Sequence, residues 1–138
     1  MEMIMASIAG LGNFALYFLV SIILLFVFKV VYAFVTPHDE WKLVKDEQNL
    51  AAAVGFGGAI IGFSLALAGA VSNSESLVDF VVWGVVAIIA QSLAFVLLRF
   101  TFMPKIAERI NDKQVSAGAI LAAVSVAVGL LNAACMSY

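Results

Sequence analysis

The sequence predicts an all-α integral membrane protein with four transmembrane helices, arranged as two homologous helical hairpins in parallel orientation. The chain is 64% hydrophobic and 12% charged, with a mean hydropathy of +1.12, whereas soluble domains carry about 25% charged residues. Four apolar stretches each reach the roughly 20 residues that a helix needs to cross the bilayer. The 138 residues leave room for these spans and short connections. We therefore expect a single membrane domain over residues 1–138.

The first repeat is predicted over about residues 11–71, with spans at 13–35 and 50–71. Aromatic residues lie toward both ends of the first span, among them Tyr32 and Phe34, as interfacial belts require. Lys29 is the only charge in this span, and its long apolar stem lets the ammonium reach the interface. The N-terminus lacks the positive segment of a cleaved signal peptide, so the first span is expected to stay as an anchor.

A short amphipathic helix is predicted between these two spans. Thr36-Pro37-His38-Asp39 is a helix-start signal, with a Thr cap and a proline at the first helical position. Trp41, Val44 and Gln48 follow at spacings that place them on one helix face. We expect this helix to lie at the membrane surface with Trp41 among the headgroups.

The second repeat is predicted over about residues 77–138, with spans at 77–102 and 115–136. Its first span has Trp83 near one end and Arg99 near the other. Pro104 then opens a second amphipathic segment, in which Ile106 and Ile110 alternate with charged residues. The second repeat therefore has the same order of elements as the first.

The basic residues predict the orientation of the chain in the membrane. All of them fall at or beside the connections after the first and third spans, whereas the opposite ends carry only the acids Glu2, Glu75 and Asp79. The positive-inside rule places the basic connections in the cytoplasm and both termini on the periplasmic side. The residues that define this pattern are Lys29, Lys42, Lys45, Arg99, Lys105, Arg109 and Lys113.

A periodic set of small residues supports the duplication. The offset of 67 between Pro37 and Pro104 aligns the two halves without a gap. Helices in a bilayer associate through close backbone approach, because lipid tails solvate apolar side chains as well as another helix does. We expect the second and fourth spans to pack on each other, or on their copies in a homo-oligomer. The set comprises Ala51, Gly55, Gly58, Gly62 and Ala66, aligned with Gly118, Ala122, Ser125, Gly129 and Ala133.

Several short motifs together resemble the YjfL-type family of small bacterial inner-membrane proteins. They are Thr36-Pro37-His38-Asp39-Glu40, Asn49-Leu-Ala-Ala-Ala53, Gly58-Ala-Ile-Ile-Gly62-Phe63, Trp83 with Gln91, and Gly129-Leu-Leu-Asn132-Ala-Ala-Cys135-Met136. The resemblance covers nearly the whole chain. It implies a domain of unknown function built from paired membrane hairpins, without an assigned catalytic site, and an association with membrane-stress systems of the phage-shock kind.

Gln91 is the leading candidate for a functional side chain inside the membrane. A carboxamide near the bilayer midplane is costly if it is left unpaired. One interpretation is an interhelical hydrogen bond to Ser64 or Ser125; the other is a polar constriction for an ion or small solute. Asn132 is a further polar candidate near the outer end of the fourth span, beside Cys135.

Enzyme chemistry and metal binding are not expected. Consecutive side chains on a helix point about 100° apart, so His38-Asp39-Glu40 cannot close on one metal ion without another segment. The sequence has no catalytic triad pattern and no phosphate-binding loop, and the single Cys135 excludes an intrachain disulfide. We expect no cofactor and no nucleic-acid partner. An acidic ring of Glu75 and Asp79 in an oligomer is a further hypothesis for attracting cations.

Two functions remain open from the sequence. The first is an oligomeric channel-like protein for an ion or small solute. The second is a non-transporting membrane scaffold or stress-response component that recruits a peripheral cytoplasmic protein or anionic lipid. Its candidate surface is Trp41, Lys42, Lys45, Lys105, Arg109 and Lys113.

Overall fold

The long apolar stretches of the sequence form helices throughout. The structure is a computed structural model that describes residues 1–36, 40–101 and 104–136, and leaves out the side chains of Glu40 and Trp41. Within these residues, four helices are long and apolar enough to cross a membrane. The helices are α1 (Glu2–Val35), α2 (Glu40–Lys45), α3 (Leu50–Asn73), α4 (Leu77–Phe100), α5 (Ile106–Asn111) and α6 (Val115–Cys135).

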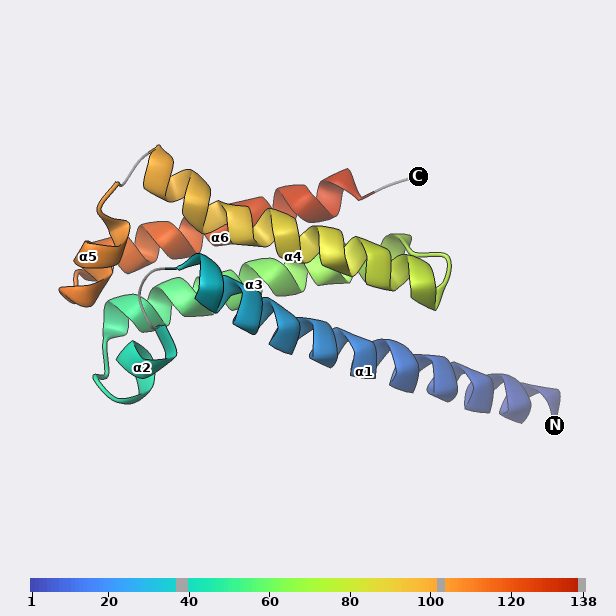
Figure 1. Cartoon of the computed structure of the whole chain (residues 1–138). Helices are drawn as coiled ribbons and strands as arrows, with labels where there is room; N and C mark the ends of the chain where they lie inside the picture. The colour runs from blue at the N-terminus through green and yellow to red at the C-terminus, as the bar shows by residue number, and fades with distance from the viewer. Residues whose placement is uncertain (37–39, 102–103, 137–138) are drawn as a thin grey trace.

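The two short helices lie at the same end of the molecule. Figure 1 shows α2 and α5 together at one end, with the N-terminus and the end of α6 toward the other. Helices α3 and α6 both start at the α2/α5 end and run side by side in the same direction. Part of the predicted helix-start signal lies outside the described residues, namely Pro37, His38 and Asp39. The same is true of Phe102 at the predicted end of the third span.

The closest packing in the bundle joins α3 to α6. A Cβ atom at Gly58 would overlap the backbone of Ala122, and one at Gly129 would overlap the carbonyl group of Gly62. Gly118 lies against Ala51 in the same way. Only glycine fits at these points, because any side chain would separate the two backbones. The small residues at helical spacing thus form the line of contact between α3 and α6, which we call the glycine seam.

Helix α1 is held by aromatic rings instead. Phe28 stacks on Phe63 of α3 with ring centroids 4.5 Å apart, and Tyr32 meets both Phe56 of α3 and Phe95 of α4 at 6.4 Å. Tyr32 is therefore buried, and the prediction that it belongs to an interfacial belt is wrong. Its ring packs in the core because α3 and α4 both offer aromatic partners there.

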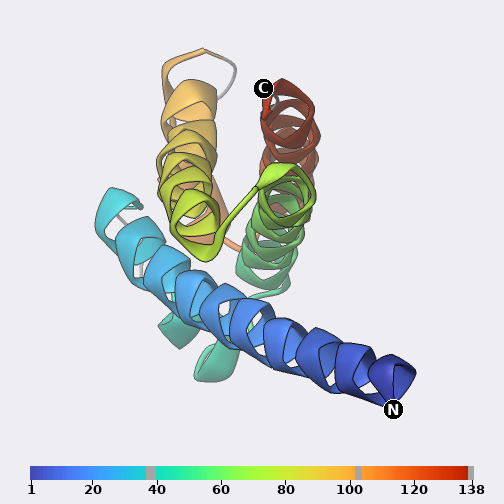
Figure 2. The ribbon, with the colours of Figure 1, turned by 90° about the vertical axis from the view of Figure 1, so that its right-hand side faces the viewer.

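Helix α1 also begins earlier than the predicted span, at Glu2 rather than near residue 13. Its 34 residues make it about 51 Å long, which exceeds the roughly 30 Å hydrocarbon core. Its N-terminal half leaves the bundle obliquely (Figures 1 and 2) and exposes large apolar side chains such as Ile4 and Leu11. A helix of this length must tilt in the bilayer or extend beyond it.

The helix ends follow an offset of 65 residues rather than 67. Helices α1 and α4 end at 35 and 100, α3 and α6 begin at 50 and 115, and the positive-φ residues before them are Gln48 and Lys113. The connections 36–49 and 101–114 are thus equally long, but their prolines occupy different places within them. The gap-free alignment on the prolines is therefore wrong for the helix ends. The duplication itself stays a prediction.

The short helices are attached to the bundle by buried apolar side chains. Leu43 of α2 is buried, as are Ile106 and Ile110 of α5, and α2 packs against α3 while α5 packs against α6 and α3. Gln48 was predicted on the apolar face of the first short helix. It instead lies beyond the end of α2, exposed and with φ of 51°, because the helix ends at Lys45.

Gly58→Ala is expected to destabilise the bundle, because the added methyl group has no room against Ala122. Overpacking of this kind costs roughly 1–3 kcal/mol. Gly57→Ala is the matched control, since a Cβ atom there meets nothing within 4 Å and alanine favours a helix by up to about 1 kcal/mol over glycine. Unfolding in mixed micelles, followed by circular dichroism, measures both variants. Equal stability of the two would contradict the glycine seam.

Candidate functional site

Gln91 lies at the junction of α3, α4 and α6. Its side chain is completely buried, and Nε2 donates a hydrogen bond to the backbone oxygen of Ser125 at 2.6 Å. A Cβ atom at Gly62 would come within 2.5 Å of the same Nε2. The missing side chain at Gly62 therefore makes the space in which the Gln91 amide reaches α6.

Three other polar atoms near this depth lack a hydrogen-bond partner among the described residues. They are Oε1 of Gln91 and the Oγ atoms of Ser92 and Ser125, all buried. Ser64, the other predicted partner of Gln91, is exposed and donates to the carbonyl oxygen of Ile60 in its own helix. The junction therefore joins Gln91 to Ser125, through the backbone of the serine rather than its hydroxyl group.

Asn132 makes a second polar link between α4 and α6. Its Nδ2 lies 3.4 Å from the carbonyl oxygen of Ala87, which is long for an N–H···O bond. Cys135, near the end of α6, is an exposed free thiol. Asn132 thus contacts α4 at Ala87, which lies one turn before Gln91 on that helix. Cys135 is not part of the junction.

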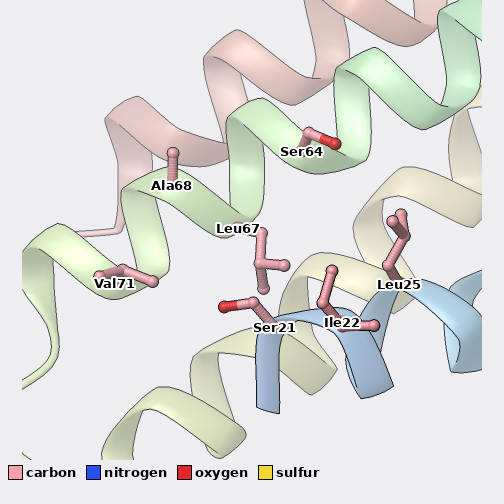
Figure 3. Close-up of a pocket in the computed structure, with 7 residues that line it drawn as sticks. All are labelled: Ser21, Ile22, Leu25, Ser64, Leu67, Ala68 and Val71. Atoms are coloured by element: carbon pink, nitrogen blue, oxygen red, sulfur yellow. The ribbon is translucent and has the colours of Figure 1, made fainter. Parts of the chain in front are cut away.

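A groove opens between α1 and α3 on another face (Figure 3). It encloses about 260 Å³. Its two hydroxyl groups donate to their own helices, Ser21 to the carbonyl oxygen of Tyr17 and Ser64 to that of Ile60. The rest of the lining is apolar, so the groove suits lipid tails and offers little chemistry. It is lined by Ser21, Ile22, Leu25, Ser64, Leu67, Ala68 and Val71.

Asn49 is an important buried residue to which sequence reasoning gave no role. It is the N-cap of α3, where its Oδ1 accepts a hydrogen bond from the backbone N–H of Ala52 at 3.1 Å. Its Nδ2 donates to the carbonyl oxygen of Ile110 at 2.6 Å. The only available signal was an asparagine directly before an apolar helix, a common cap. The second bond, which ties α3 to the end of α5, had no sequence signal.

The predicted cytoplasmic surface lies at the α2/α5 end. Lys42, Lys45, Lys105 and Lys113 are all exposed. Arg109 is half-buried and its Nε donates to Oε1 of Gln114 at 2.7 Å. We call these five residues the basic end. Trp41 was predicted to belong to the same surface, but its side chain is not among those that the structure describes.

The acids at the opposite end have a local role. Ser76 caps α4 by accepting a hydrogen bond from the N–H of Asp79, whose carboxylate accepts one from the N–H of Glu75. This reciprocal pattern satisfies donors at the start of the helix. Among the described residues, no group of three metal-ligand side chains lies together. His38, Asp39 and the side chain of Glu40, which were not expected to hold a metal ion by themselves, lie outside the described part of the chain.

Comparisons with known proteins identify relatives over nearly the whole chain. A family model described as "Domain of Unknown Function (DUF350)" matches residues 5–136. The UPF0719 inner membrane protein YjfL of Escherichia coli strain K12 is 34% identical over 125 residues, which are 91% of this chain and 93% of that protein. The UPF0719 transmembrane protein YshE of Bacillus subtilis strain 168 is 28% identical over 125 residues, covering 90% and 92%. No solved structure matches the chain.

The chain therefore belongs to the DUF350 family, and the predicted resemblance to YjfL-type proteins is confirmed. Both named relatives are described as membrane proteins. Together with the four long apolar helices, this confirms the predicted all-α integral membrane protein.

Asn49→Ala is expected to lower the free energy of unfolding by about 2 kcal/mol. About half comes from the lost cap of α3 and half from the lost bond to Ile110. Gln114→Ala is the control at the N-cap of α6, where the side chain makes no cap bond. It removes only the exposed hydrogen bond from Arg109, so it should cost less than about 0.5 kcal/mol. Unfolding in mixed micelles compares them. Similar losses in both variants would mean that Asn49 does not tie α3 to α5.

Proposed function

We propose that this member of the DUF350 family is a non-transporting membrane scaffold. In this proposal it lies in the inner membrane with both termini on the periplasmic side, and its basic end faces the cytoplasm. The basic end binds anionic lipid, and a peripheral protein that recognises the same surface is the alternative partner. The proposal needs no enzyme chemistry and no cofactor.

The observation that carries this proposal is the exposure of lysines on either side of a short helix, α5, that is itself anchored. Ile106 and Ile110 are completely buried while Lys105 and Lys113 beside them are exposed. The charges are therefore held at a fixed place at the end of the bundle. Basic residues near an anionic membrane surface each contribute about 1 kcal/mol to binding.

The assembly we propose combines the two parallel hairpins with a homo-oligomer. The equal 65-residue spacing of the helix ends supports two homologous halves. The glycine seam is occupied within one chain, so it is not available to a neighbouring copy. The apolar N-terminal half of α1, which lies outside the bundle, is the surface on which copies would meet.

Reversing the charges of Lys105, Arg109 and Lys113 to Glu is expected to abolish the preference for anionic lipid. The measurement is the fraction of spin-labelled phosphatidylglycerol that the reconstituted protein immobilises, relative to spin-labelled phosphatidylcholine. A triple variant with Lys105→Arg, Arg109→Lys and Lys113→Arg keeps the charges and should keep the preference. An unchanged preference in the reversed variant, with its helical content intact, would remove the proposed role of the basic end.

A channel-like function is the second candidate, and one observation favours it. Buried polar atoms normally have hydrogen-bond partners, yet Gln91, Ser92 and Ser125 each leave an oxygen without one among the described residues. Water or an ion passing between α3, α4 and α6 would satisfy these atoms. Such a path requires the packed junction to open, because Gln91 is completely buried.

Ion flux across proteoliposomes tests this second candidate. A channel through the junction predicts that Gln91→Leu abolishes flux at matched protein density, because the apolar side chain removes both polar atoms of the amide. Cys135→Ser, at an exposed site outside the junction, is the control and should leave flux unchanged. Flux that persists in Gln91→Leu would count against the junction as a pore. The absence of flux in the unaltered chain would count against a channel and would leave the scaffold as the proposed function.

A further inference from the structure

A separate depression lies at the corner between α4 and α5. It has a volume of about 250 Å³ and contains the side chains of three charged residues. Arg99 belongs to the last turn of α4, and Lys105 is the residue directly before α5. The depression is therefore built where the chain leaves a membrane-spanning helix. It is lined by Arg99, Pro104, Lys105, Ala107 and Glu108.

The neighbouring Phe100 indicates the depth of this depression. This residue is 77% exposed and lies at the end of a helix that is apolar along nearly its whole length. The guanidinium carbon of Arg99 lies 6.0 Å from the centroid of the Phe100 ring. An exposed apolar ring belongs against lipid and a guanidinium belongs in the headgroup layer. The corner between α4 and α5 therefore lies at the boundary between the lipid tails and the headgroup layer.

The charges in the depression favour an anion. Arg99 and Lys105 contribute two positive charges and Glu108 one negative charge, which leaves one positive charge. Among the described residues, neither Arg99 nor Lys105 has an ion-pair partner, whereas the guanidinium group of Arg109 donates a hydrogen bond to Gln114. A singly charged phosphodiester neutralises the remaining charge, and arginine and lysine are the side chains that bind phosphate oxygens.

We propose that this depression binds the headgroup of an anionic phospholipid, with its phosphodiester between Arg99 and Lys105. The acyl chains then run along the apolar surface beside Phe100. Inorganic phosphate has the same oxygen chemistry, but it leaves this apolar surface unused. The proposal rests on the proposed scaffold function and deepens it, because it assigns lipid binding to one site that includes Arg99 rather than to the whole basic end.

The test is native mass spectrometry of the full chain released from nanodiscs that contain phosphatidylcholine and phosphatidylglycerol. The readout is the ratio of the two lipids that stay bound. Both leaflets of a nanodisc have the same composition, so an inverted orientation of a variant does not change the result. The double variant Arg99→Gln with Lys105→Gln is compared with Lys45→Gln plus Lys113→Gln, which removes the same charge from the part of the basic end that lies outside the depression.

The unaltered chain should retain phosphatidylglycerol in preference to phosphatidylcholine. At about a fivefold preference per base, the Arg99/Lys105 variant should lower the ratio of bound lipids by about 25-fold. The Lys45/Lys113 variant should lower the ratio clearly less than the Arg99/Lys105 variant does, because its exposed bases lie outside the depression and act on the headgroup only through screening solvent. Glu108→Gln should raise the ratio, since it removes the negative charge from the lining.

Three results would overturn the site. Equal losses in the two double variants would mean that charge acts diffusely, and would leave the basic end as the lipid-binding surface. Displacement of the lipid by inorganic phosphate would assign the site to free phosphate. Retention of phosphatidylethanolamine as strongly as phosphatidylglycerol would show that the site takes a zwitterion, with Glu108 as the partner of its ammonium group. A lack of any lipid preference in the unaltered chain would contradict the proposed function itself.

Discussion

The direct approach of the α3 and α6 backbones is the constraint on which the other contacts depend. Lipid tails solvate apolar side chains, so burial alone gives these helices little reason to associate. Contact must come from dispersion between closely spaced atoms, which requires residues without bulky side chains. The glycine seam meets this requirement. It also permits the polar junction, because Gln91 reaches the Ser125 carbonyl only through the space that Gly62 leaves.

The remaining helices attach to this pair in two different ways. Helix α4 makes polar links to α6 through Gln91 and Asn132, and these fix its position along and around the axis of α6. Helix α1 depends on stacked rings such as Phe28 and Phe63 near its C-terminal end, and its other half has few partners in the bundle. The bundle of α3, α4 and α6 is thus fixed more firmly than the outer half of α1, whose exposed apolar side chains can contact a lipid or another copy.

Much of the fold could be predicted from the sequence, because its main signals are local and periodic. Span length and the spacing of Gly58 and Gly62 are properties of one segment, and the structure uses both. The roles of Tyr32 and Asn49 were not predictable in this way. From local sequence alone, a tyrosine near the end of a span is predicted at the membrane interface, and an asparagine before a helix is predicted as a cap. Neither prediction depends on which residues the other helices of the bundle place nearby. The burial of these two residues depends on Phe95 and Ile110, which are distant in sequence. The proposed site at Arg99 was not predictable from local signals either, because it depends on how the start of α5 is placed against the end of α4.

The polar junction and the charged corner are physically separable, although one helix carries both. Gln91 and Arg99 are eight residues apart on α4, or about 12 Å along its axis. The first is a buried amide whose bond holds two helices together, and the second is an exposed cation in the last turn of α4. A channel through the junction needs Gln91 to lose its bond to α6 and contact water. The proposed scaffold needs Arg99 to contact a lipid headgroup while the bond between Gln91 and α6 stays intact. The two functions therefore make opposite demands on the junction, and the proposed scaffold is the one that leaves its packing intact.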